Sequence, residues 1–220
     1  MLKKWWFSYR LLLSRAPVTG LILTVNTALF IVVSVYSQSI FSPDLFFLYK
    51  LGAKENISIM QGQYWRFFTA GFLHFGALHF AINNFALYYI GPIIENMLTR
   101  FRFIVIYMLA NVCGFWFSFI FSNAISVGAS AAIFGLLGVG IAFEQHSGDT
   151  ISKVLRGINR EPLGLKQKYT LFIRLKPFLG VTILNIGLGF LINTLFFIIG
   201  VNIGIDNFAH LGGVLTGFSL

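Results

Sequence analysis

Residues 77–97 read ALHFAINNFALYYIGPIIENM, a run in which Glu95 is the only charged side chain. A helix that crosses the hydrocarbon core of a bilayer needs about 20 mainly apolar residues, so this run predicts a transmembrane helix. His79 and Asn83 are four residues apart near its start and therefore lie on one face of that helix. The stretch thus predicts a membrane protein with a polar site near one end of a span.

The composition of the whole chain also indicates a membrane protein. Of its 220 residues, 57% are hydrophobic and only 10% are charged, against about 25% charged residues in an ordinary soluble domain. A globule of this size buries only about 70% of the surface that its unfolded chain exposes, so many apolar side chains would face water in a soluble protein. The composition therefore excludes a soluble enzyme, a disordered protein and a nucleic-acid binder, despite the net charge of +9.

The chain contains six long apolar stretches, which predict an all-α membrane protein with six transmembrane helices. The predicted spans are residues 16–36, 77–97, 103–121, 129–143, 178–200 and 208–220. The fourth and the sixth are too short to cross the hydrocarbon core at 1.5 Å per residue. The fourth can begin below the outer surface if other helices shelter it, and we expect the sixth to continue beyond Leu220.

The positions of the positive charges predict the orientation of these spans. With the N-terminus in the cytoplasm, 13 of the 16 Lys and Arg residues lie inside, and Lys50, Lys54 and Arg66 lie outside. An excess of inner positive charge is typical of membrane proteins. Residues 1–15 are then a cytoplasmic segment, and residues 16–220 form one membrane domain whose first span is an uncleaved anchor.

Two long connections join the predicted spans. Residues 38–74 form the outer connection, whose apolar runs favour a position in the membrane interface. Residues 144–177 form the inner connection, which is basic and is expected to face the lipid headgroups.

Four polar side chains on three predicted helices lie at a similar depth near the outer face. Besides His79 and Asn83, these are Ser130 at the start of the fourth span and His210 near the start of the sixth. A polar side chain within a span is costly, so each is a functional candidate by default. A histidine can take the proton of a serine hydroxyl, while His79, Asn83 and helix N-terminal amides can stabilise an oxyanion. The arrangement therefore predicts hydrolysis by a serine nucleophile.

Small residues on the fourth and sixth predicted spans predict close packing of these helices around Ser130 and His210. One face of the fourth span carries Ala131, Gly135, Gly138 and Ala142, and one stripe of the sixth carries Gly213 and Gly217. Small residues at this spacing let helix backbones approach closely in lipid. We therefore expect the helix of His210 to pack directly against the helix of Ser130.

Other assignments for these residues are weaker. A serine at a helix start is most often an N-cap, and Asp206 is expected to cap the sixth helix rather than to form a triad with His210. The H-E-x-x-H motif of zinc proteases does not occur, and no span contains an Asp for an aspartyl mechanism. Cys113 is the only cysteine, so it is expected to serve packing. A small transporter would need broken helices or charges at mid-bilayer, which the apolar stretches lack.

Taken together, these residues resemble the rhomboid intramembrane serine proteases. The matching motifs are, in chain order, Trp65-Arg66, His74, His79 and Asn83 in the pattern H-x4-H-x3-N, Glu95, Gly128-Ala129-Ser130-Ala131 and Ala209-His210-Leu211-Gly212-Gly213. The resemblance implies a six-helix rhomboid-like bundle, a Ser130/His210 catalytic dyad and an oxyanion hole formed by His79 and Asn83. It also implies supporting roles for Gly128, Phe134 and Gly213, with Phe134 packed on His210, and no metal or organic cofactor.

The resemblance also implies an activity. Enzymes of this family cleave membrane-embedded helices at their outer ends, so the implied partners are the lipid bilayer and single-span transmembrane substrates. These would enter between the second and fifth spans, where Phe196 and Phe197 are candidates for a gate. The alternative is a catalytically inactive relative that only binds membrane proteins, and the presence of both Ser130 and His210 argues against it. We expect a multi-pass protein of a bacterial plasma membrane, with its site facing away from the cytoplasm.

Overall fold

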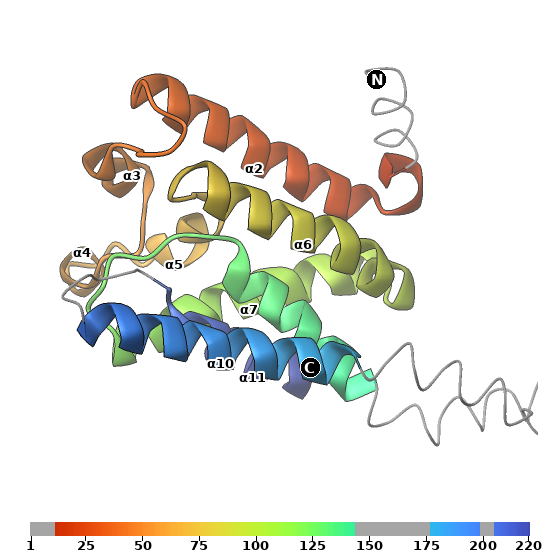
Figure 1. The fold of residues 1–220 in the computed structure, drawn as a ribbon. Coiled ribbons are helices and arrows are strands. Elements are labelled where there is room, and N and C mark those ends of the chain that lie inside the picture. Colours follow the sequence, from red (N-terminus) through yellow and green to blue (C-terminus); the bar gives the residue numbers. More distant parts are fainter. Residues whose placement is uncertain (1–11, 144–176, 199–204) are drawn as a thin grey trace, which may run out of the picture.

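The computed structural model describes residues 12–143, 177–198 and 205–220, in which helices are joined by loops (Figure 1). The only pairing of extended backbone within them is an isolated antiparallel bridge between Lys54 and Ser126. Among the described residues, three helices are long and apolar enough to cross a membrane, namely α2 (Pro17–Tyr36), α6 (Gly76–Met97) and α7 (Arg100–Phe121). Three more follow, namely the apolar helix Ser130–Phe143, α10 (Pro177–Ile198) and α11 (Asn207–Ser219).

Each predicted span coincides with one of these helices, and the bounds differ by at most three residues. The largest difference is at α7, which begins at Arg100 rather than at residue 103 because Thr99 caps its first turn, accepting from the Arg102 N–H at 3.3 Å. A helix can extend past the last apolar residue into the headgroup region, where charged side chains are tolerated. Most of the predicted inner connection, and residues 1–11 of the N-terminal segment, lie outside the described residues.

The outer connection folds into a group of short helices at one end of the bundle (Figure 1). These are α3 (Leu45–Leu51), α4 (Asn56–Met60), α5 (Arg66–Thr69) and the 3-10 helix η1 (Ala70–Phe72). Arg66 holds them together, because its buried guanidinium donates to the carbonyls of Tyr49 and Ala53, both at 2.8 Å. The helix α6 starts at this end and runs antiparallel to α2.

Glu95 joins α6 to α2 at the opposite end. Its carboxylate accepts from the N–H groups of Val18 and Thr19 at 3.0 and 2.8 Å, and from the Thr19 hydroxyl at 2.7 Å. These N–H groups belong to the first turn of α2 and have no partner within that helix. A negative charge at a helix N-terminus is also favourable. Glu95 therefore caps α2 from a neighbouring helix.

The helix Ser130–Phe143 lies at the centre of the core. Residues 131–141 are all buried, as expected for a helix that is apolar on every side. Its side chains pack with Leu87 of α6 and with Phe103 and Tyr107 of α7. By contrast, α2 and α6 expose large apolar side chains such as Leu21 and Phe85, which suits helices that face lipid.

Glycines bring α11 into backbone contact with this central helix. A Cβ added at Gly213 would overlap the carbonyl oxygen of Ala131, and one at Gly217 would overlap that of Gly135. On the other side, a Cβ at Gly114 of α7 would lie 2.7 Å from the Ala131 Cβ. The expected close packing of the two small-residue faces is thus present in the structure.

Candidate active site

His79 lies in the first turn of α6, and its ring orientation is set by the chain just before it. The backbone N–H of Phe75 donates to His79 Nδ1 at 3.3 Å. In a neutral imidazole one nitrogen accepts and the other carries the proton, so this bond assigns the proton to Nε2. His79 therefore presents an N–H donor on the side of its ring away from Phe75.

Ser130 follows a sharp bend at Gly128, whose φ of +129° is one that side-chain-bearing residues rarely adopt. The Gly128 N–H donates to the Ala70 carbonyl at 2.9 Å, which fixes this bend against the outer connection. A Cβ placed on Gly128 would lie 2.8 Å from His79 Nε2 and 3.7 Å from Ser130 Oγ. Ser130 Oγ and His79 Nε2 therefore both lie within 4 Å of the Cβ position of Gly128.

His210 lies in the first turn of α11, with its ring stacked on Phe134. The two ring centroids are 4.3 Å apart and the planes differ by 18°. Phe134 is four residues after Ser130 on the central helix, so the two share one helix face. Within the described residues, His210 Nδ1 has no hydrogen-bond partner and no hydrogen bond joins the ring to the Ser130 hydroxyl. The structure thus places His210 on the Ser130 face of the central helix without a direct bond between them.

Asn83 is buried on α6, 4% exposed, and its side-chain amide donates to the His79 carbonyl at 2.9 Å. An asparagine amide has two N–H donors. One of them is engaged within α6 in this structure.

Asp206 caps α11, as predicted. Its carboxylate accepts from the Ala209 N–H at 3.0 Å and from the hydroxyl of Ser118 on α7. The His210 N–H donates to the backbone carbonyl of Asp206 at 3.1 Å. Asp206 therefore organises the start of the helix that carries His210.

His74 lies just before α6 and next to His79, with ring centroids 5.4 Å apart. It is almost fully buried, and burial is the main reason that its pKa falls to about 3. His74 is therefore neutral across the physiological range and contributes packing at this corner. No group of three His, Cys, Asp or Glu side chains suited to a metal ion occurs in the described part of the chain.

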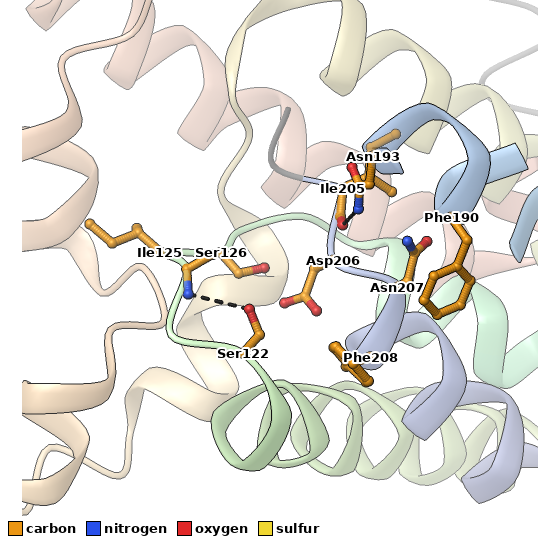
Figure 2. A pocket seen from close by; sticks show the side chains of 10 residues that line it. Ser122, Ile125, Ser126, Phe190, Asn193, Ile205, Asp206, Asn207 and Phe208 are labelled. Carbon is orange, nitrogen blue, oxygen red and sulfur yellow. Dashed lines mark hydrogen bonds between the residues drawn. The ribbon is translucent and has the colours of Figure 1, made fainter. Parts of the chain in front are cut away.

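A cavity of about 410 Å³ opens beside the start of α11 (Figure 2). Its wall comes from the loop that follows α7, from α10, and from the start of α11 with the two residues before it. The lining residues are Ser122, Ala124, Ile125, Ser126, Phe190, Asn193, Ile205, Asp206, Asn207 and Phe208. The Asn193 amide donates to the Ile205 carbonyl at 2.7 Å across this wall. The side chains of Phe196 and Phe197, the predicted gate, lie outside the described residues.

Lys54 is not among the predicted site residues, although it is buried and its ammonium donates to the Ser122 carbonyl at the end of α7. The sequence predicts only that it is an outer positive charge. Positive charges are depleted on the outer side of membrane proteins, so a lysine that persists there is a signal for a specific contact.

Comparison with known proteins shows the family of this chain. The family model of the Rhomboid domain matches residues 61–220, a range that includes all four site candidates. The chain belongs to the rhomboid family. It is 34% identical over 171 residues to the rhomboid protease GluP of Bacillus subtilis, a match that covers 78% of this chain and 28% of GluP.

Plant rhomboid relatives match to a similar degree. RHOMBOID-like protein 6, mitochondrial, of Arabidopsis thaliana is 33% identical over 175 residues, covering 79% of this chain and 48% of the relative. RHOMBOID-like protein 7 of the same plant is 33% identical over 192 residues, covering 84% and 50%. The chain thus spans about a quarter to a half of the length of these relatives. Family membership and the apolar helices together make this rhomboid a membrane protein.

Proposed function

We propose that this rhomboid is an intramembrane serine protease that hydrolyses peptide bonds at the outer ends of substrate transmembrane helices. The observation that carries the proposal is that His79 Nε2 and Ser130 Oγ both lie beside Gly128, while the His210 ring stacks on Phe134 of the Ser130 helix. The similarity to a named rhomboid protease, GluP, supports the same activity.

In the proposed reaction, His210 takes the proton of the Ser130 hydroxyl as Oγ attacks the carbonyl carbon of the substrate peptide. The carbonyl oxygen becomes an oxyanion and accepts from His79 Nε2–H, from the unengaged N–H of Asn83 and from the backbone N–H of Ser130. His210 then gives its proton to the leaving amine, and the C–N bond breaks. Water, deprotonated by His210, then attacks the acyl carbon, the bond from that carbon to Ser130 Oγ breaks, and His210 returns the proton to Oγ.

The proposed setting is a six-span bundle of a bacterial plasma membrane with a cytoplasmic N-terminus. In that orientation, the starts of α6, of the central helix and of α11 all lie toward the extracytoplasmic side, where water reaches Ser130. The outer connection would rest in the membrane interface, because it exposes apolar side chains such as Phe46, Met60 and Trp65. The proposed substrates are single-span membrane proteins.

The proposal is tested with the purified chain in liposomes and a panel of single-span substrates. Ser130→Ala and His210→Ala are expected to lower kcat by about 10⁴-fold or more, because each removes a group that acts on the reacting atoms. Ser219→Ala, which removes an exposed hydroxyl on α11, is the matched control and should retain wild-type activity.

Cleavage that persists in Ser130→Ala would contradict the dyad. A serine-reactive phosphonate probe gives a second measurement, in which wild-type protein should be labelled at Ser130 and His210→Ala should not. A folded wild-type protein that binds single-span proteins but neither cleaves them nor reacts with the probe would instead be the inactive binding relative.

A further inference from the structure

Lys54 of the outer connection is completely buried, with 0% of its side chain exposed. Its ammonium donates to the carbonyls of Ser118, Ser122 and Ala124 at 3.3, 2.7 and 3.1 Å. The Ser122 and Ala124 carbonyls lie just beyond the C-terminal end of α7, which carries partial negative charge, and the Ser118 carbonyl in the last turn also accepts from the Ser122 N–H at 2.8 Å. Lys54 therefore caps α7 from a different segment of the chain.

The backbone of Lys54 contacts the segment that leads to the nucleophile. The Lys54 N–H donates to the Ser126 carbonyl at 2.9 Å, and the Ser126 N–H donates back at 3.0 Å. Ser126 is four residues before Ser130, and the intervening residues 127–129 are buried. A displacement of Lys54 would therefore be transmitted to Ser130 through a short, tightly packed segment.

The side chain of Lys54 is also linked to the helix of His210. Ser118 accepts from Lys54 through its carbonyl and donates through its hydroxyl to Asp206, the N-cap of α11. The charged groups that face Lys54 are the carboxylates of Asp206 and Glu55. Burial lowers the pKa of Lys54 to about 8, and these two carboxylates limit the decrease.

We infer that Lys54 is a positioning residue, which fixes the relative positions of Ser130 and His210 without being part of the proposed dyad. The inference rests on the proposed function and adds to it a role for the outer connection. Burying an ammonium is costly, and an apolar side chain of the same length would fill the space without that cost. The charge therefore serves to orient the α7 carbonyls and Asp206, which both dyad helices depend on.

The first test compares Lys54→Met, Lys54→Arg and the control Lys50→Met in liposomes with a single-span substrate. Lys50 is an exposed lysine of the same connection. Lys54→Met is expected to lower kcat by about ten- to a hundredfold with KM nearly unchanged, as a small misplacement of reacting groups does. Lys54→Arg should recover most of the loss, and Lys50→Met should match wild type. A wild-type kcat in Lys54→Met overturns the inference.

The second test measures kcat as a function of pH, because positioning and a merely structural role of Lys54 predict different profiles. Between about pH 8 and the ordinary lysine pKa, the unfolded chain holds the Lys54 proton and the folded chain does not, so this group makes folding more favourable as pH rises. Positioning predicts the opposite trend for kcat, which should fall as pH rises through about 8. Lys54→Arg, which stays charged, should lack that fall, and an identical profile in both proteins overturns the inference.

A third measurement does not depend on activity. Hydrogen exchange of peptides spanning residues 126–132 and 206–212 should be faster in Lys54→Met than in wild type, and unchanged in Lys50→Met. If the wild type cleaves nothing, the proposed function fails while this measurement still tests the link. Unchanged exchange overturns the inference.

If Lys54→Met does not fold, Ser118→Ala keeps the Lys54 contacts and removes only the hydroxyl bond to Asp206. It should then lower kcat severalfold, and a wild-type kcat overturns the inference.

Discussion

Gly128 has no side chain, and the geometry of the candidate site depends on that. Its positive φ turns the chain into the central helix, and the space where a Cβ would lie is occupied by the His79 ring. The site thus requires two separate things of Gly128, namely a backbone conformation with positive φ and an empty Cβ position for the His79 ring. Both are needed for Ser130 Oγ and His79 Nε2 to lie beside Gly128.

Gly128→Ala is expected to abolish most activity, because its Cβ would lie 2.6 Å from His79 Cε1 and displace the ring. Losing one oxyanion donor lowers kcat by about 10²- to 10³-fold. The matched control is Gly62→Ala, because Gly62 also has a positive φ, +95°, but nothing lies within 4 Å of its Cβ position. Gly62→Ala should cost about 1 kcal/mol of stability and keep kcat. Equal kcat in the two variants, measured in liposomes, would contradict this account.

Between elements, the contact of α11 with the central helix determines where His210 lies. This contact is formed by backbone atoms, since Gly213 and Gly217 lie against the carbonyls of Ala131 and Gly135. In lipid there is little hydrophobic drive to join helices, so such close packing supplies much of the attraction. The position of the His210 ring therefore depends on two glycines, one and two turns further along α11.

Gly213→Ala is expected to destabilise the protein by about 1–3 kcal/mol, because its Cβ overlaps the Ala131 carbonyl and neither backbone can yield easily. It should also lower kcat, since α11 moves away from Ser130. The same change at Gly187 of α10, where nothing lies within 4 Å, should be neutral or stabilising by up to about 1 kcal/mol. Denaturation midpoints in detergent measure the first effect. A Gly213→Ala protein as stable as Gly187→Ala would contradict this packing account.

For the molecule as a whole, orientation in the membrane determines which compartment the site faces. The short helices of the outer connection and the starts of α6 and α11 lie at one end, and the turn between α6 and α7 lies at the other (Figure 1). Glu95 joins α6 to α2 at the end where α6 turns into α7. The distribution of Lys and Arg predicts that the first end is extracytoplasmic.

Single cysteines test that orientation. After Cys113→Ala, a membrane-impermeant maleimide applied to intact cells should label Gln61→Cys in the outer connection. Thr99→Cys, in the turn between α6 and α7, should be labelled only after the cells are permeabilised. Both positions are exposed in the structure, so a difference in labelling reports the side of the membrane. The reverse pattern would contradict a cytoplasmic N-terminus.

The positions of the helices could be predicted from the sequence because a span leaves a local signal, about 20 apolar residues with few charges. The candidate site residues could be predicted for a related reason, since a polar side chain such as His210 is conspicuous within an apolar run. Asp206 as the cap of α11 was predictable from its position next to the helix start. All of these depend on residues close together in the sequence.

The sequence by itself therefore determined a helical membrane protein, the approximate bounds of its helices and the residues that form the candidate site. Only the tertiary structure decided that Lys54 caps α7, that Glu95 caps α2 and that His79 and Ser130 both lie beside Gly128. These contacts join residues about 50 to 80 positions apart. A local pattern of polarity carries no information about which distant backbone groups lack a partner, because that is known only once the helices have packed.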